Sequence, residues 1–175
     1  MSLKSAVRNA TQAVADAMSF GEESDASKDI LKTLKDEHNE VKELLSQLAK
    51  AAGAAQRKGL VKRIKKALVP HTKAEEKIVY DAVLALRDTD AKVDGYEGYL
   101  EHEWASKTLL RLGSIANAAS PEHRAAGKVL KELVEHHIRE EETNVWGDVR
   151  AHFTDEQRVA MNRRYLAAKK RVRVP

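Results

Sequence analysis

The sequence predicts an all-α protein built on an antiparallel four-helix bundle, and three observations support this fold class. The 175 residues include only three prolines and eight glycines, so the chain has few places to turn. Apolar residues make up 42% and charged residues 33% of the chain, as is ordinary for a helical protein in water. In four segments the apolar residues recur at spacings of three and four, the period of one helix face. This length suits one domain with short additions.

The first predicted segments are an N-terminal extension and the first bundle helix. Residues 1–26 are Ala-rich and weakly amphipathic up to "FGEESDAS", which suits either a docked helix or a loose tail. The first helix is expected from Ser27 to about Ala52, with Gly53 placed to end it. Its inner stripe consists of Leu31, Leu34, His38, Val41, Leu45 and Leu48.

The second helix is expected over residues 56–87, with one inner stripe that keeps its phase throughout. The stripe consists of Leu60, Ile64, Leu68, His71, Glu75, Ile78, Ala82 and Leu86. Pro70 should kink this helix, because proline removes one backbone hydrogen bond and collides with the preceding turn. The alternative is two helices that meet at Pro70, but Val69 is a poor N-cap.

Two further bundle helices and a fifth helix complete the prediction. A capping box from Asp94 to Glu97 is expected at the start of the third helix, whose inner face carries His102, Ala105, Leu109 and Leu112. Ser120 and Pro121 suit the cap and first position of the fourth helix. The inner face of that helix carries Leu130, Leu133, Val134, His137, Glu141 and Val145. Thr154 and Gln157 favour a fifth helix to about Arg171, so residues 153–175 form a predicted C-terminal helix and basic tail.

The inner stripes share an unusual polar feature. Each bundle helix has one histidine on its apolar face near mid-length, and the second and fourth helices add a glutamate four residues later. These residues are His38, His71, Glu75, His102, His137 and Glu141. The stretches "HTKAEEKIVYDAVLA" and "HIREEETNVWGDVRA" match in register, which indicates a weak internal repeat. In an antiparallel bundle the six side chains should converge on one buried point.

A metal site is the interpretation that best explains this convergence. A lone histidine on an apolar face is usually a hydrogen-bonded core residue, and an isolated inward glutamate can pair with a lysine. Two buried carboxylates without partners would cost several kcal/mol each, a large share of a domain stability of about 5–15 kcal/mol. The chain has no cysteine, and mixed imidazole and carboxylate ligands suit iron, manganese or zinc. Six side chains are too many for one tetrahedral zinc, so two metal ions are expected, with Glu75 and Glu141 able to bridge them.

The four motifs resemble those of a known family. The segments "DEHNEVKELL", "HTKAEEKIVY", "LEHEWASKTLL" and "HHIREEETNVW" place HxxxEE twice between two lone histidines. Over about residues 28 to 150 the chain resembles a hemerythrin HHE cation-binding domain. The resemblance implies an up-down-up-down bundle over residues 27–152 and a centre of two non-haem iron ions with a bridging oxo or hydroxo group. It implies as metal ligands His38, His71, Glu75, His102, His137 and Glu141.

One departure from the family pattern bears on function. In the oxygen-carrying members, the third helix has a second histidine four residues after the first, where this chain has Ser106. The six side chains and a bridging hydroxide leave about two of about twelve octahedral positions open. Further candidate ligands near in sequence are Tyr99, Glu101, Glu103 and His136. Extra open positions favour redox turnover or sensing over oxygen carriage.

The expected function is that of a di-iron protein that meets dioxygen, peroxide or nitric oxide as a sensor, scavenger or store. One alternative is a di-iron enzyme that degrades peroxide or oxidises iron, and the ligand pattern alone does not decide whether the protein is an enzyme. Another alternative is a regulatory helical bundle that acts through a protein partner, whose identity the sequence does not give.

Charge and hydropathy limit the other partners. The net charge is +4, with basic residues concentrated in "VKRIKK" and "NRRYLAAKKRVRVP". Basic residues at the end of a helix complement its dipole. Base stacking would require a series of aromatic residues interleaved with the basic ones, and the sequence has no such series. Nucleic-acid binding is therefore not expected. No apolar run reaches the roughly 18 residues of a membrane span. Asp16 interrupts the region where a signal peptide would be apolar, so a cytoplasmic location is expected.

Overall fold

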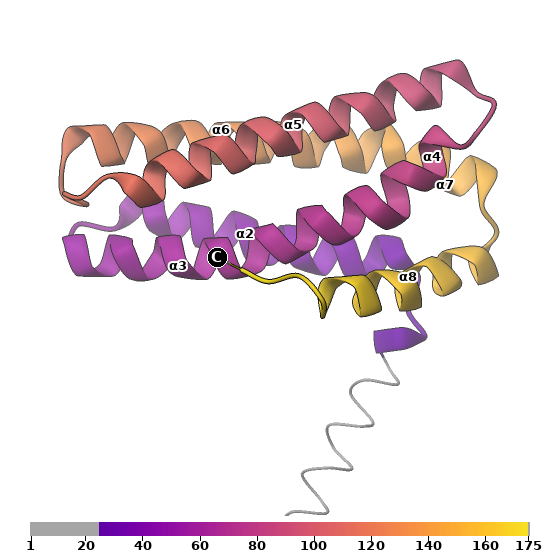
Figure 1. The fold of residues 1–175 in the computed structure, drawn as a ribbon, viewed down its shortest axis with the longest axis horizontal. Coiled ribbons are helices and arrows are strands. Elements are labelled where there is room, and N and C mark those ends of the chain that lie inside the picture. Colours follow the sequence, from indigo (N-terminus) through magenta and orange to yellow (C-terminus); the bar gives the residue numbers. More distant parts are fainter. Residues whose placement is uncertain (1–24, 175) are drawn as a thin grey trace, which may run out of the picture.

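The computed structural model describes residues 25–174, which contain helices and no strand. Four long rods form an up-down-up-down bundle (Figure 1). They are α2 (Ile30–Lys50), the continuous rod of α3 (Ala54–Glu75), η1 (Glu76–Tyr80) and α4 (Asp81–Leu84), then α5 (Thr89–Ser114) and α6 (Pro121–Thr143). Two shorter helices follow, α7 (Val145–His152) and α8 (Asp155–Lys169). The predicted all-α bundle is confirmed. Of the predicted extension over residues 1–26, residues 1–24 lie outside the part of the chain that the structure describes.

Side-chain caps start several helices where the sequence indicates. The Ser120 hydroxyl accepts the His123 N–H ahead of α6, whose first residue is Pro121. Thr154 and Gln157 form a reciprocal capping box at the start of α8, as predicted. These caps satisfy backbone N–H groups that have no partner inside the helix.

Two predicted helix boundaries are wrong. The N-cap residue of α5 is Asp88, six residues before the predicted cap Asp94, because Asp88 accepts the N–H groups of Asp90 and Ala91. Gly53 does not end the first helix, which stops at Lys50. Instead it is the N-cap residue of α3. The periodicity of apolar residues alone did not locate the N-cap residues of α3 and α5.

The second rod changes phase, contrary to the prediction of one continuous stripe. Residues Glu76–Tyr80 form a π-helical turn, which contains an extra residue relative to α-helix. Beyond this turn Tyr80 and Val83 are buried, whereas Ala82 and Leu86 are only partly buried. Helix α3 runs through Pro70, so the alternative of two helices meeting there is also wrong. The rod bends between α3 and α4 (Figure 1), and both an internal proline and a π turn cause such bends.

Two apolar clusters fill the bundle, one on each side of the polar residues. The first cluster includes Leu45, Ile64, Leu109 and Leu130. The second includes residues such as Ile30, Ile78, Val145 and Met161. On α2 the sequence passes from Leu34 in the second cluster through His38 to Val41 in the first. The inward histidines and glutamates therefore form a polar layer between the two apolar clusters.

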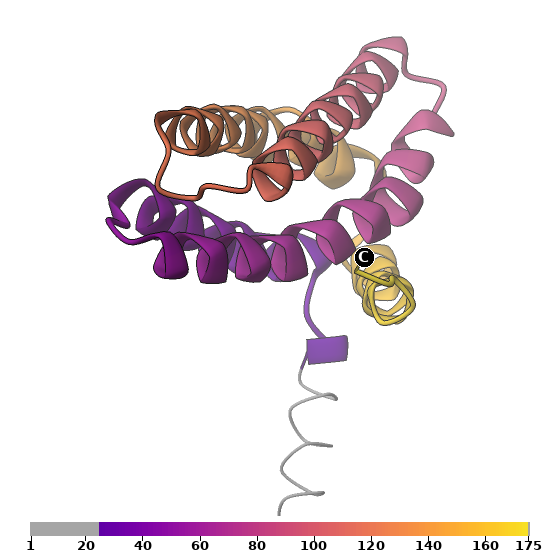
Figure 2. The same ribbon diagram turned by 60° about the vertical axis from the view of Figure 1, so that its left-hand side comes forward.

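The C-terminal helix packs back on the bundle. Helix α8 contacts α2 and α3, and it runs along the side of the second rod in both views (Figures 1 and 2). Arg158 on α8 pairs with Asp29, the N-cap residue of α2, at 2.7 Å. The fourth rod is interrupted at Asn144, so the predicted helix through Val145 is divided into α6 and α7. Among the described residues, no helix combines the length and apolar character that a membrane crossing requires.

Candidate metal centre

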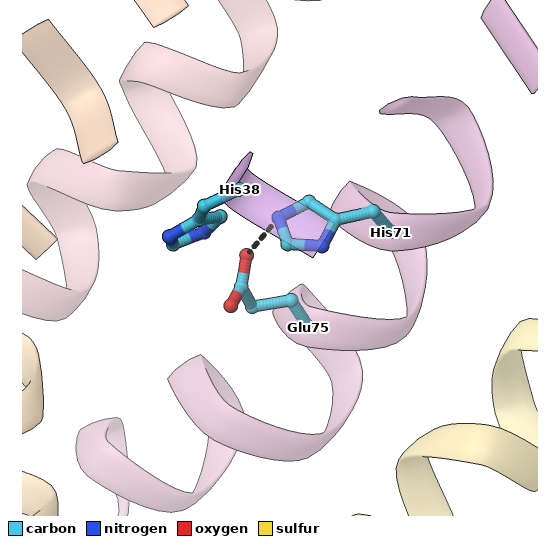
Figure 3. Close-up of side chains that lie close together, drawn as sticks. All are labelled: His38, His71 and Glu75. Atoms are coloured by element: carbon cyan, nitrogen blue, oxygen red, sulfur yellow. Dashed lines mark ion pairs between the residues drawn. The ribbon is translucent and has the colours of Figure 1, made fainter. Parts of the chain in front are cut away.

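The six inward side chains meet at one level of the bundle. They are His38, His71, Glu75, His102, His137 and Glu141, and none is more than 5% exposed. Helix α2 supplies the first, α3 the next two, α5 the fourth and α6 the last two. Figure 3 shows His38, His71 and Glu75 turned toward one another from two neighbouring helices. The convergence expected from the sequence is therefore present in the structure.

Each of the two carboxylates of this layer faces two histidines. Glu75 Oε2 lies 3.1 Å from His71 Nε2 and 3.6 Å from His102 Nε2. Glu141 Oε2 lies 3.2 Å from His38 Nε2 and 3.5 Å from His137 Nε2.

The histidines themselves form two pairs. The ring centroids of His38 and His71 are 5.1 Å apart, and those of His102 and His137 are 4.6 Å apart. The possible ligand atoms of His38, His71 and Glu75 lie within 4.8 Å of one another, and so do those of Glu75, His102 and His137. Glu75 is common to both groups, as a bridging ligand would be.

Several buried polar atoms of the centre have no hydrogen-bond partner within residues 25–174. They include both carboxylate oxygens of Glu75, Oε2 of Glu141 and Nε2 of His38. The short nitrogen–oxygen distances above are therefore not well-formed hydrogen bonds. Buried unpaired charge is costly, and a cation between these atoms would offset that cost. Imidazole nitrogens with carboxylate oxygens are a donor set that suits iron, manganese or zinc, so the residues present fit a pair of such ions.

A second set of carboxylates surrounds the histidines. Each histidine directs its Nδ1 toward a glutamate, with His38 facing Glu142 at 3.0 Å, His71 facing Glu37 at 3.0 Å, His102 facing Glu76 at 3.4 Å and His137 facing Glu101 at 2.8 Å. A carboxylate at Nδ1 holds the proton there and leaves Nε2 free as a metal ligand. We call these four glutamates the outer carboxylates.

The outer carboxylates follow a simple rule in the sequence. Each is the chain neighbour of an inward residue, and adjacent residues on a helix point about 100° apart. The inward residue therefore faces the centre while its neighbour reaches the next helix. The contacts run from α2 to α3, from η1 to α5, from α5 to α6 and from α6 back to α2. Glu37, Glu76 and Glu142 were not predicted as site residues from the sequence. The recurring pairs "EH" and "EE" were the available signal.

Tyr80 is a residue of the centre that the sequence analysis missed. Its hydroxyl donates to Glu141 Oε1 at 3.3 Å and lies 3.5 Å from His102 Nε2. The π turn brings it inward, and Gly98 leaves space for its ring, because a Cβ at Gly98 would lie 2.6 Å from Tyr80 Cζ. Burial, followed by the charges of Glu141 and Glu75, raises the pKa of Tyr80, so the phenol keeps its proton.

The C-terminal helix contributes to the same surroundings. The Tyr165 hydroxyl donates to Glu37 Oε2 at 2.6 Å and lies 3.1 Å from His71 Nδ1. Lys169 Nζ lies 2.7 Å from the same oxygen of Glu37. Helix α8 therefore fixes the outer carboxylate of His71, a role that the predicted separate C-terminal segment did not include.

The other candidate ligands point elsewhere. Glu101 contacts His137 Nδ1, and His136 is about half exposed with Nε2 3.4 Å from Glu101. Tyr99 donates to the Glu76 carbonyl and to Asp81, and Glu103 pairs with Lys107 at the surface. Ser106 is partly buried in the wall of a surface groove that also contains Glu76 and Tyr99. His136 therefore faces solvent and the neighbouring helix α5 instead of the centre.

The sequence of this chain matches known proteins. The model of the hemerythrin HHE cation-binding domain matches residues 29–147. The chain belongs to this family. A curated relative, a DNA nickase of Nostoc sp. (strain PCC 7120), is 26% identical over 136 residues, which are 78% of this chain. The chain spans only 38% of that relative's length. No solved structure matches the chain.

The pKa values of the inward residues differ from one side of the centre to the other. Burial alone would lower the pKa of His71, but Glu75 and Glu37 raise it to about 10. Burial and the neighbouring His137 lower the pKa of His102 to about 3. Burial and the charge of Glu141 raise the pKa of Glu75 to about 7. Near neutral pH the metal-free centre therefore holds protons on one side, which a metal ion would have to displace.

The outer carboxylates Glu37 and Glu142 carry negative charge. His71 and Lys169 overcome the effect of burial and lower the pKa of Glu37 to about 2. A hydrogen bond from His38, against burial and with help from Lys35, lowers the pKa of Glu142 to about 2. Ionised outer carboxylates strengthen the histidines as donors toward a cation.

Proposed function

We propose that this HHE domain holds two non-haem iron ions and that this centre meets dioxygen, peroxide or nitric oxide, as a sensor, scavenger or store. The observation that supports the proposal is the pair of carboxylates, each of which faces one histidine of either pair. His38 and His71 would hold one ion, His102 and His137 the other, with Glu75 and Glu141 between them. The unpartnered buried oxygens of both glutamates fit this assignment.

Bound iron would supply one-electron redox chemistry and Lewis acidity. The remaining work belongs to the chain. Glu37, Glu101 and Glu142 lie within hydrogen-bond distance of a histidine Nδ1, so each holds a proton there and orients Nε2 inward. Tyr80 holds a proton on its hydroxyl beside Glu141 and His102, where it can be donated to a small bound molecule. The apolar clusters on either side of the layer exclude water.

The donor count favours redox or sensing chemistry over oxygen carriage. The six side chains would supply about eight donor atoms if both glutamates used both oxygens, whereas two octahedral ions would have about twelve positions. None of Tyr99, Glu101, Glu103 and His136 faces the centre to complete the count. Positions therefore remain for water or a small ligand, whether the protein degrades peroxide, oxidises iron or senses a gas.

The test is to mix the anaerobically reduced, iron-loaded protein with dioxygen, peroxide or nitric oxide and to record absorption in a stopped-flow instrument. Dioxygen is expected to oxidise the centre, and vacuum should not restore the reduced spectrum. The small molecule that the centre binds most tightly should give an absorption spectrum different from the other two. Tyr80→Phe should slow the reaction with peroxide, because the nearby proton donor is removed. A dioxygen complex that vacuum removes reversibly would contradict the preference for redox or sensing chemistry.

A second candidate function is the cleavage of one strand of bound DNA, which the name of the Nostoc relative raises. The observation that favours it is a cluster of basic residues on α3, most of them exposed: Lys58, Lys62, Arg63, Lys65 and Lys66. Such a face can bind phosphates in a salt-dependent way. Incubation of iron-loaded protein with supercoiled plasmid tests this function. Open-circular product that is lost in a Lys62→Glu/Lys66→Glu variant supports it, and unchanged plasmid rejects it.

A further inference from the structure

A narrow pocket lies beside the centre, where α5 passes the end of α6. Its wall includes Tyr80, Gly98, His137 and Glu141. Glu141 is 1% exposed, and its Oε2 atom has no hydrogen-bond partner. The pocket has a volume of about 10 Å³, close to what one water molecule requires. It therefore suits an ion or a molecule of a few atoms, and nothing larger.

The outer part of this pocket is acidic. The side chains there are Asp94, Glu97, Glu101 and Glu140, and among the described residues no lysine or arginine lines the pocket. Glu97 is exposed, whereas Asp94 and Glu140 are partly buried. Burial raises the pKa of Asp94, and the charges of Asp90 and Glu140 add to the effect, as expected where negative charges crowd together. A cleft lined by one sign of charge concentrates ions of the opposite sign.

Other hollows of the surface differ in both charge and position. A groove at Glu76 and Ser106 also contains Lys73 and Lys107, and it reaches an outer carboxylate without reaching Glu75 or Glu141. A pocket near the opposite end of the bundle is lined by Arg57, Arg124 and Lys128. The acidic pocket is the one of these three that combines negative lining with side chains of the centre.

We propose that this acidic pocket is the route by which divalent cations reach the buried centre, and that Asp94, Glu97 and Glu140 select cations over anions at its mouth. The inference rests on the proposed function, because it assumes that the centre binds metal ions. Gly98 keeps the wall free of a side chain at the point where the pocket meets Tyr80. The three carboxylates act on the rate of metal uptake, and the six inward residues determine how much metal is held.

The experiment follows the loading of metal-free protein with Co²⁺, whose visible absorption reports binding by histidine and carboxylate. The test variant is Asp94→Asn/Glu97→Gln/Glu140→Gln. The control variant is Asp36→Asn/Glu40→Gln/Glu43→Gln, which changes the net charge equally on the exposed face of α2. Final metal content is measured by elemental analysis, so the rate and the capacity are read separately.

The test variant should reach the wild-type content of two ions per chain at least about 10-fold more slowly at low ionic strength. The difference should shrink at high salt, which screens exposed charges, and the control variant should load as fast as wild type. Equal rates in all three proteins at full metal content would overturn the uptake route while leaving the proposed function intact. Equal slowing of both variants would also overturn it, because net charge alone would then act. Metal content near zero in wild type would overturn the proposed function and the route together.

Discussion

At the scale of single residues, the outer carboxylates orient the histidines and do not themselves face the centre. Substituting one of them therefore tests the effect of histidine orientation on metal affinity. Glu142→Gln should weaken metal affinity about 10- to 100-fold, because an amide cannot replace the charge that holds the proton on His38 Nδ1. Glu40→Gln, on the exposed side of the same helix as His38, is the matched control. Competition with a chelator of known affinity measures the effect. Equal affinities in both variants and in wild type would show that the outer carboxylates do not contribute.

His71 gives the metal-free protein a characteristic dependence on pH. Its pKa is about 10 in the folded chain and about 6.5 when unfolded. The folded state binds this proton more tightly, so the stabilisation is complete below about pH 6.5 and is lost as the pH rises toward 10. The free energy of unfolding of the metal-free protein should therefore fall across this window.

Denaturant unfolding of the metal-free protein at pH 6.5 and pH 9.5 measures this dependence, and His71→Gln is the comparison. The variant should show a clearly smaller decrease, because it lacks the titrating group. Glu75, whose pKa is raised to about 7, loses its own contribution between about pH 4.5 and pH 7, below most of that window. The same decrease in both proteins would contradict the assignment to His71.

The six inward residues could be predicted from the sequence because each falls on an apolar stripe of helical period. The outer carboxylates could not be found by that argument, because Glu37 and Glu101 lie off the stripe and look like solvated charges. Their partners are on other helices, so only the packing of the rods shows which nitrogen each one faces. Tyr80 was missed for a different reason, since its orientation depends on the π turn.

At the scale of secondary structure, the close approach of α5 to the π turn depends on Gly98. Gly98→Ala should destabilise the protein by about 1–3 kcal/mol, because the new methyl group would force the buried Tyr80 ring aside. Gly59→Ala in α3 has no atom within 4 Å of the new Cβ and should instead stabilise by up to about 1 kcal/mol. Thermal unfolding of both variants measures the contrast, and a stabilising effect at both positions would contradict the packing described here.

Helix boundaries illustrate what local sequence can and cannot specify. The caps at Ser120 and Thr154 were predicted because side chain and spacing agree there with the apolar pattern. The start of α5 was misplaced because Asp88 and Asp94 are both acceptable caps, and tertiary packing buries Ala91 ahead of the later one. The π turn has no comparable signal, since its energy depends on contacts with α5 and α8.

At the scale of the whole molecule, the polar layer ties the stability of the bundle to metal. Two ions present at about 1,000 times their dissociation constants would add about 4 kcal/mol each. The iron-loaded protein should therefore melt at least about 10 °C above the metal-free protein at neutral pH. Calorimetry of both forms at the same protein concentration measures this shift. Coincident melting curves would mean that the centre is incidental to the fold.

The molecule also joins its last helix to the centre. Tyr165 and Lys169 reach Glu37 from α8, although the family match ends at residue 147. The capping residues Thr154 and Gln157 predicted the helix, but the face by which it packs on the bundle became clear only with the ion pair of Arg158 and Asp29. The bundle and its fifth helix therefore act together around His71.

The most direct test of the central claim is the metal content of protein purified from iron-replete cells. Elemental analysis should find close to two irons per chain in wild type and in His136→Ala, whose side chain lies outside the centre. His71→Ala and Glu75→Ala should each lose at least one iron, because each removes a donor from the layer. A single tightly held ion in wild type, or unchanged iron in both of these variants, would contradict the dinuclear centre.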